Sequence, residues 1–343
     1  MKEYSLSKRN ALQVKLDIAV ETWKMSQSLT ITGHTWDEFR FVVVTLNDGV
    51  HQGRGEAAGV YYLNDVPARM VAQIEATRER IESGITREEL RSILPPGGAR
   101  NAIDCALWEL ESKRIGKPVW ELAGMSTPKP LLTTYTLGAD TPEAMATGAR
   151  DKYRDAKAIK LKLLGDGEDA ARVKAVRLAR DDVWMGVDAN QGFTAETLTA
   201  ILPALIEARV QLIEQPFRIG DEAQLDDVRS PIPLAADESV QSLNDVAALA
   251  GRFQVINIKL DKCGGLTEAL LMAEKARLLG IRVMVGNMGG TSLAMAPAMI
   301  VGQYCHVVDL DGPLFLTTDR SPSVMYDRGF ISTPTVGYGW LAA

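Results

Sequence analysis

The sequence has 343 residues, of which 46 % are hydrophobic and 24 % are charged, the balance of a globular protein with one large domain or two ordinary ones. Its formal net charge of −6 at pH 7 argues against a binding surface for nucleic acid or an anionic membrane, because such surfaces need clustered Lys and Arg. No apolar run reaches the roughly 18 residues of a membrane-spanning helix, and the three cysteines contain no C-x-x-C pair that would indicate a zinc site.

Residues 1–125 predict an α+β domain. The stretches VKLDIAVETW (14–23) and DEFRFVVVTLNDGVHQGRGEA (37–57) have the character of antiparallel strands, and the second turns at Asn47-Asp48-Gly49. Apolar residues at helical spacing then predict three helices, at about 66–84, 87–93 and 99–115. Gly116 and Pro118 end the last of them.

The pattern changes after residue 125 to an alternation of strands and amphipathic helices. Eight short apolar strands begin near residues 132, 157, 183, 210, 232, 254, 281 and 306. Eight such repeats predict a closed (β/α)₈ barrel of the TIM type at 126–312, capped by 1–125, with 313–343 packing back on the cap. An open doubly wound sheet would need a glycine-rich phosphate turn after its first strand, and the sequence has none.

The predicted second strand, AIKLKLLG (158–165), carries two lysines on one face. Ile159, Leu161 and Leu163 alternate with Lys160 and Lys162, and successive side chains of a strand point to opposite sides. The two ammonium groups would therefore lie about 7 Å apart, two residues at the usual strand rise.

Ionisable residues also end the neighbouring strands, where barrels of this type hold their active sites. They are Asp188 after the third strand, Glu214 after the fourth, Asp237 after the fifth, Lys259 after the sixth, and Asp309 and Asp311 after the eighth. Any one of them is read most simply as a loop carboxylate or a structural ion pair. The whole set is not, because each buried charge has to be compensated.

Asp188, Glu214 and Asp237 come from three consecutive strands and would repel one another unless a cation lay between them. A set of oxygen ligands selects a hard ion, which favours Mg²⁺ over Ca²⁺ or Mn²⁺. A structural ion is the alternative, and the lysines flanking the same point argue against it.

Lys162 and Lys259 belong to strands that are four apart, so they would face each other across the barrel axis. A lysine acts as a base when a neighbouring cation lowers its pKa, and Lys160 and the metal ion would be such neighbours of Lys162. Two bases that face one carbon can remove its proton from one side and return it to the other.

These motifs together resemble the muconate-lactonising branch of the enolase superfamily over nearly the whole chain. The matching order is Lys-x-Lys (160–162), Asp-x-Asn (188–190), Glu-Gln-Pro (214–216), Asp-Glu-Ser (237–239) and Lys-x-Asp-Lys (259–262). The stretches AIDCALWEL (102–110) and GKPVWELAG (116–124) resemble the capping domain of that family.

The resemblance implies a role for each of these residues. Lys162 and Lys259 would be the acid/base catalysts, and Asp188, Glu214 and Asp237 the ligands of one Mg²⁺ per subunit, for which Mn²⁺ would substitute. Lys160 and Thr136 would contact substrate, and Asn190 and Asp261 would support the site. The reaction would pass through an enediolate intermediate whose charge the metal stabilises.

Asp309-Leu310-Asp311 resembles the Asp-x-Asp motif with which dipeptide epimerases of this branch hold the α-ammonium group of their substrate. Both carboxylates would face the barrel mouth. We therefore expect Mg²⁺-dependent epimerisation of a dipeptide, L-Xaa-L-Yaa to L-Xaa-D-Yaa, by 1,1-proton transfer. A solvated loop pair is the alternative interpretation of the two acids.

Two loops depart from the glutamate-specific members. The glutamate-specific epimerases of this branch carry an arginine in the first capping loop, whereas KMSQSLTITGHT (24–35) has none and offers only Lys24. The loop at 286–298 keeps the glycine-rich shape of the family, but its middle differs and includes Met288. Tyr61 and Tyr62 would be apolar walls for the substrate, or else part of the core of the cap. We expect the enzyme to prefer dipeptide substrates whose C-terminal residue is neutral or apolar over those that end in glutamate.

Three alternatives remain. An N-acylamino-acid racemase, or a cycloisomerase or o-succinylbenzoate synthase of the same branch, would keep both lysines and the metal but would have no ammonium group for Asp309 and Asp311. A non-catalytic barrel is disfavoured because the lysines and ligands are complete. The absence of an apolar centre in MKEYSLSKRNALQ argues against a secretory signal. We expect a cytoplasmic homo-oligomer without nucleic-acid or membrane partners.

Overall fold

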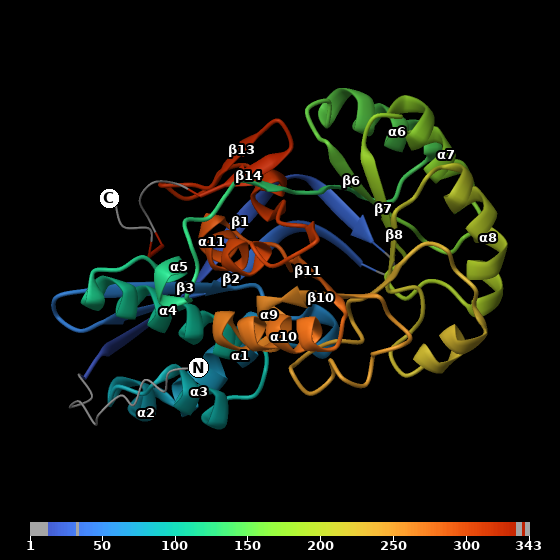
Figure 1. Cartoon of the computed structure of the whole chain (residues 1–343). Coiled ribbons are helices and arrows are strands. Elements are labelled where there is room, and N and C mark those ends of the chain that lie inside the picture. The colour runs from blue at the N-terminus through green and yellow to red at the C-terminus, as the bar shows by residue number, and fades with distance from the viewer. Residues whose placement is uncertain (1–12, 32–33, 334–337, 340–343) are drawn as a thin grey trace.

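The computed structural model describes residues 13–31, 34–333 and 338–339, and it begins with a three-stranded antiparallel sheet. The strands are β1 (Lys15–Ile31), β2 (His34–Asn47) and β3 (Gln52–Ala57). The predicted turn after β2 is confirmed, because Gly49 takes a φ of +88° and its backbone N donates to the Asn47 side chain at 2.7 Å. The β1–β2 hairpin extends from the sheet toward the barrel (Figure 1).

Helices cover one face of this sheet. They are η1 (Tyr61–Leu63), α1 (Pro67–Ala76), α2 (Arg78–Glu82), α3 (Arg87–Ile93), α4 (Gly98–Ile115) and α5 (Val119–Leu122). The prediction of one helix at 66–84 is wrong, because the helix is interrupted at Thr77, between α1 and α2. The Thr77 hydroxyl donates to the carbonyls of Gln73 and Ile74 at 3.1 and 3.0 Å, an alternative to continued helical bonding.

Eight parallel strands form the second sheet, in the spatial order β12-β11-β10-β9-β8-β7-β6-β5. They are β5 (Tyr135–Leu137), β6 (Ala158–Lys162), β7 (Trp184–Asp188), β8 (Leu212–Glu214), β9 (Leu234–Ala236), β10 (Val255–Lys259), β11 (Arg282–Gly286) and β12 (Val307–Val308). The edges meet where Thr134 N, just before β5, donates to Val308 O at 2.9 Å. The predicted TIM-type barrel is confirmed.

Helices on the outside connect most of these strands (Figure 1). They are α6 (Pro142–Thr147), the π-helical turn η2 (Gly148–Lys152), α7 (Asp169–Ala179), α8 (Ala195–Glu207), α9 (Leu260–Cys263), α10 (Leu266–Leu278) and α11 (Ser292–Gly302). We predicted a helix between each pair of barrel strands, and this is wrong for two of the connections. Between β8 and β9 lies only the 3₁₀ helix η3 (Glu222–Asp227), and between β9 and β10 the described chain makes turns. In that second connection the Asp245 carboxylate accepts from the amides of Gln241 and Ser242, which favours a turn.

The chain after β12 forms η4 (Gly312–Phe315) and the hairpin β13 (Met325–Asp327) and β14 (Phe330–Ser332). β14 pairs with β4 (Leu131–Leu132), which we had expected to begin the first barrel strand. The segment also contacts the cap, since Thr317 N donates to Lys24 O at 2.9 Å and the Tyr338 hydroxyl donates to Cys105 O at 3.0 Å. The boundaries at 125 and 312 stay a prediction.

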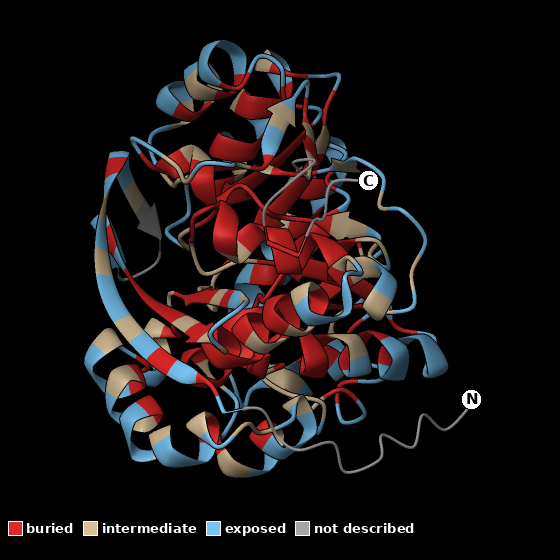
Figure 2. Ribbon diagram, turned by 90° about the vertical axis from the view of Figure 1, so that its left-hand side faces the viewer, coloured by how far each residue is buried: buried red, intermediate tan, exposed pale blue. Residues whose placement is uncertain are grey.

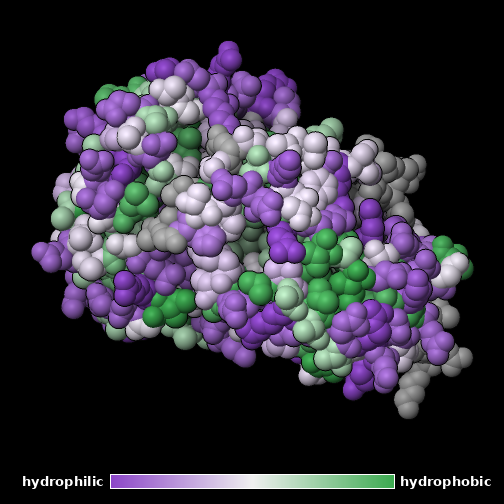
Figure 3. All heavy atoms as spheres, turned by 180° about the vertical axis from the view of Figure 1, so that it is seen from behind, coloured by the Kyte–Doolittle hydropathy of each residue, from purple (hydrophilic) through white to green (hydrophobic). Residues whose placement is uncertain are grey.

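Burial separates the inside of the barrel from its surface. The barrel strands and the helix faces against them are buried, and exposed residues lie on the outer helix faces (Figure 2). On the face seen in Figure 3 hydrophilic residues predominate, and apolar ones gather on the side of the capping domain. Within the described ranges no helix has the length and apolar character to span a membrane.

Candidate active site

The register of the parallel strands brings the ionisable residues together at the carboxyl end of the barrel. Lys162 of β6 is the neighbour of Asp188 of β7, and Asp188 is the neighbour of Glu214 of β8. Asp237 directly follows β9, and Lys259 ends β10. All five side chains are buried, so the structure gathers every one of these predicted residues in one place.

The three carboxylates can hold a metal ion. Asp188, Glu214 and Asp237 each offer an oxygen, and these oxygens lie within 4.8 Å of one another. Burial and the neighbouring Asp188 charge raise the pKa of Glu214 to about 8. A cation between the carboxylates would compensate this repulsion, and a buried set of carboxylate oxygens fits a hard divalent ion such as Mg²⁺.

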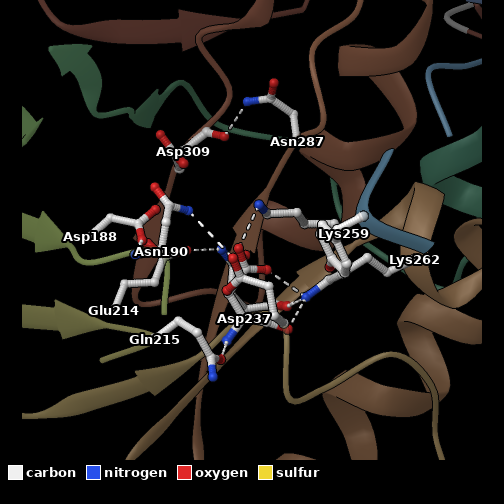
Figure 4. A network of polar contacts seen from close by, with 12 residues as sticks. Asp188, Asn190, Glu214, Gln215, Asp237, Lys259, Lys262, Asn287 and Asp309 are labelled. Carbon is white, nitrogen blue, oxygen red and sulfur yellow. Dashed lines mark hydrogen bonds and ion pairs between the residues drawn. The ribbon is translucent and has the colours of Figure 1, made fainter. Parts of the chain in front are cut away.

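Amide groups fix the orientation of the acids. The Asn257 side-chain nitrogen donates to Glu214 at 2.7 Å, and the Asn190 backbone N donates to Asp188 at 2.9 Å. The Gln215 side-chain oxygen accepts from Asp237 N at 2.8 Å (Figure 4). Our sequence analysis missed Asn257 and Gln215, although Gln215 lies inside the Glu-Gln-Pro motif.

The two lysines predicted as bases contact acids on different strands. Lys162 Nζ lies 2.6 Å from an oxygen of Asp188, and Lys259 Nζ lies 2.7 Å from an oxygen of Asp237. Lys259 reaches Asp237 from the side opposite to Asp188 and Glu214 (Figure 4). Since β6 and β10 are four strands apart in the sheet order, the two amino groups flank the carboxylate cluster.

Lys262 is a further buried cation that the sequence analysis did not single out. It lies one helical turn after Lys259, and its Nζ is 2.6 Å from Asp237 Oδ1 and 3.0 Å from Asn257 O. Burial alone would raise the pKa of Asp237, but Lys259 and Lys262 hold it well below its usual value. The second lysine of Lys-x-Asp-Lys was the available signal.

Lys160 lies among three carboxylates. Its Nζ is 3.4 Å from Glu214 and 3.7 Å from Asp188, and it donates to Asp309. Burial would lower the pKa of Lys160, but Asp309, Glu214 and Asp188 together raise it well above its usual value. Lys160 is therefore a charged group at the base of the site.

The two acids after β12 have different partners. Asp309 accepts from Lys160 and from the Thr134 hydroxyl. Asp311 accepts from the backbone N of Thr136 at 2.7 Å, and burial together with the Asp309 charge raises the pKa of Asp311 to about 6. The structure thus places Asp309, Asp311 and Thr136 together, but within the described part of the chain only Asp309 of the two acids has an ion pair.

A cavity between the barrel mouth and the capping domain is lined by Thr136, Lys160, Lys162, Asp237, Lys259, Asp309 and Asp311. It encloses about 670 Å³ outside the protein atoms, part of it open to solvent, which is within the usual range for small-molecule sites. Asn190, Tyr61, Tyr62 and Met288 line it as well, whereas Lys24 does not and is exposed on β1.

Asp261 lies beside the cavity and contacts the cap. Its carboxylate accepts from the backbone N of Ala58 and of Gly59, both at 2.9 Å. These amides lie three and two residues before Tyr61, so Asp261 connects the chain after Lys259 to the second capping loop.

Family comparisons agree with this arrangement. Residues 144–340 match the model of the enolase C-terminal domain-like family, and residues 13–124 match the N-terminal domain of mandelate racemase and muconate lactonizing enzyme. The chain belongs to the enolase C-terminal domain-like family. The family and the capped barrel predicted from the sequence are thereby confirmed.

Two curated relatives of this family member cover most of its length. It is 38 % identical over 310 residues, 90 % of this chain and 96 % of the relative, to the L-Ala-D/L-Glu epimerase of Escherichia coli K12. It is 39 % identical over 296 residues, 85 % of this chain and 92 % of the relative, to an N-acetyl-D-glutamate racemase of a Pseudoalteromonas species. Both names denote isomerases, as the sequence predicted.

Solved structures of the family match the fold. An enolase family member from Agrobacterium tumefaciens with bound sodium and L-Ala-L-Glu has a TM-score of 0.90 and 39 % identity over 93 % of this chain and 97 % of its own. The dipeptide epimerase of Methylococcus capsulatus with Mg and L-Arg-D-Lys has a TM-score of 0.88 and 26 % identity over 94 % and 97 %.

Proposed function

We propose that this chain is a Mg²⁺-dependent epimerase that converts L-Xaa-L-Yaa dipeptides into L-Xaa-D-Yaa dipeptides. One observation carries the proposal: Lys162 and Lys259 flank the buried carboxylate cluster, and Asp311, which no described cation pairs with, lies at another side of the same cavity. Relatives that are named epimerases and a dipeptide complex with Mg support it.

Asp188, Glu214 and Asp237 would hold the metal ion. When bound, Mg²⁺ would supply positive charge for the substrate carboxylate as its α-carbon loses a proton. The chain itself moves that proton. One lysine removes it from one face of the α-carbon, and the ammonium form of the other lysine returns a proton to the opposite face. Lys160 would contribute a fixed positive charge near the same carboxylate.

The direct test is an assay of a dipeptide library in D₂O by mass spectrometry. An epimerase incorporates one deuterium at the α-carbon of the C-terminal residue, and chiral separation then shows the inverted product. A library in which no dipeptide exchanges or inverts would contradict the proposal.

An N-acylamino-acid racemase is the second candidate. The ion pair between Asp309 and Lys160 favours it, because one of the two acids expected to hold an ammonium group is already neutralised. The relative named N-acetyl-D-glutamate racemase supports it too. N-acetylated amino acids therefore belong in the same assay.

A further inference from the structure

The capping domain lines its side of the cavity with apolar and aromatic residues. Leu29 comes from β1, Trp36 and Phe39 from β2, and Tyr61 and Tyr62 from η1. We call Trp36, Phe39, Tyr61 and Tyr62 the aromatic wall. Among the described residues, the cap contributes no charged side chain to the cavity.

The rings of the aromatic wall hold one another in place. The Tyr61 ring lies edge-on to Trp36 at 5.0 Å and edge-on to Tyr62 at 5.2 Å, and Trp36 is 6.4 Å from Phe39. Such contacts add to the stability of each ring beyond simple burial. The wall is therefore a preformed apolar surface.

The aromatic wall lies next to the end of β9. The Tyr62 hydroxyl accepts from the Gln241 side chain at 3.1 Å, four residues after Asp237. Tyr61 and Glu238, the residue after Asp237, line the same cavity. Asp309 and Asp311, by contrast, follow β12, three strands further along the sheet.

A dipeptide bound for proton transfer has two side chains to place. If its carboxylate lies at the carboxylate cluster and its ammonium group at Asp311, the N-terminal side chain stays beside that ammonium group, and the side chain on the reacting α-carbon is the one left for the aromatic wall. Apart from the acids and the lysines, the cavity is lined by the aromatic wall, by the apolar side chains of Leu29, Met288 and Phe315, and by a few polar residues of the strand ends.

Among the residues that the structure describes, the cavity has no unpaired cation for an acidic side chain. The lysines that line it are Lys160, Lys162 and Lys259, and each already contacts a carboxylate of the strand ends. Glu238, also in the lining, is a further acid and supplies no cation. A glutamate side chain would thus be desolvated against aromatic rings without a partner, which is unfavourable.

We propose that the residue this enzyme epimerises carries an apolar side chain, aromatic or large aliphatic, which packs against Trp36 and Tyr61. This inference rests on the proposed dipeptide epimerase function and specifies its substrate. It separates this chain from the two relatives whose names include L-Ala-D/L-Glu or whose structure holds L-Ala-L-Glu.

The test compares kcat/KM for L-Ala-L-Phe, L-Ala-L-Leu, L-Ala-L-Glu and L-Ala-L-Lys by deuterium incorporation. We expect the two apolar substrates to exceed the other two by about tenfold or more, the effect of burying one large apolar side chain. A preference for L-Ala-L-Glu overturns the inference but leaves the epimerase function intact, as does a preference for L-Ala-L-Lys through cation–π contacts. Absence of exchange with all four contradicts both.

Variants of the wall give a second, independent measurement. Tyr61→Arg supplies a cation at the wall and should shift the ratio of kcat/KM from L-Ala-L-Phe toward L-Ala-L-Glu by at least about tenfold. Trp36→Ala should raise KM for L-Ala-L-Phe more than for L-Ala-L-Ala. Tyr304→Ala, an exposed tyrosine outside the cavity, is the matched control and should leave both ratios unchanged. Equal ratios in all three variants would overturn the inference.

Discussion

At the residue scale, the pairing of each lysine with one acid gives the site two distinct sides. Lys162 contacts Asp188, Lys259 contacts Asp237, and neither lysine shares its acid with the other. In the mechanism we propose, the two amino groups act on opposite faces of one carbon, and the acids between them hold the metal ion.

This geometry predicts a different task for each lysine. Lys162→Ala and Lys259→Ala should both lower epimerisation by roughly a thousandfold, within the range of general acid–base catalysis. Each variant can still exchange deuterium into one stereoisomer, because the remaining base reaches one face of the α-carbon. Chiral chromatography with mass spectrometry in D₂O measures both effects. Lys174→Ala, an exposed lysine on α7, is the control. Normal epimerisation by either site variant would disprove the two-base arrangement.

Asp309 contacts a lysine and Asp311 a backbone amide, so substituting the two acids should change substrate preference differently. Asp311 has no ion pair with any residue the structure describes, so Asp311→Asn should remove the preference for a free dipeptide over its N-acetyl form. The expected loss is about ten- to a hundredfold in that ratio, the usual value of a hydrogen bond to a charged group. Asp309→Asn should instead lower kcat/KM for both compounds by a similar factor, because Asp309 positions Lys160. If the wild type uses both compounds equally well, the racemase becomes the better interpretation.

At the element scale, one buried carboxylate connects a barrel helix to a capping loop. Asp261 of α9 accepts from the amides of Ala58 and Gly59, and no cation of the described residues is paired with it. Burial, with a smaller contribution from the charge of Asp65, raises the pKa of Asp261 from 3.8 to about 7. The protonated form is therefore favoured by folding.

The sign of the pH dependence follows from this raised pKa. Stability from protonated Asp261 is fully present below about pH 4 and is lost as the pH rises through about 7. Asp261→Asn cannot ionise, so its unfolding free energy should fall less between pH 5 and 8, by on the order of a few kcal/mol. Urea unfolding at several pH values measures it, with the exposed Asp227→Asn as control. Parallel pH profiles of wild type and Asp261→Asn would contradict the assignment.

At the scale of the whole molecule, the cavity exists only where the cap meets the barrel. Helix α4 joins the two, since Asp104 accepts from the backbone N and the hydroxyl of Thr267 at 2.9 and 2.6 Å, and the Trp108 indole donates to the same hydroxyl at 2.9 Å. The barrel supplies charged groups and the cap supplies the aromatic wall. Displacement of the cap would therefore open the site to water.

Metal binding should stabilise the whole fold, because three buried carboxylates are left repelling one another without a cation. EDTA should abolish activity and lower the melting temperature by a few degrees, and Mg²⁺ should restore both. Asp188→Asn should be inactive, and its melting temperature should respond much less to Mg²⁺. Differential scanning fluorimetry measures the shift. Full activity and an unchanged melting temperature after chelation would contradict the metal assignment.

The sequence by itself determined the barrel, the cap and the residues of its strand ends. This was possible because strand periodicity is local and because the carboxyl ends of parallel strands meet at one edge, so Asp188, Glu214, Asp237, Lys162 and Lys259 had to converge. The family followed from the same residues.

Only the tertiary structure decided how these groups are partnered. The ion pair of Lys160 with Asp309 joins residues 149 positions apart, and the bond of Gln241 to Tyr62 joins residues 179 positions apart. Likewise, Leu131 and Leu132 pair with β14 and are not part of the barrel sheet. Lys262 contacts Asp237, and Asn257 donates to Glu214. Local periodicity has no information on such contacts, since they depend on which surfaces meet after the chain has folded.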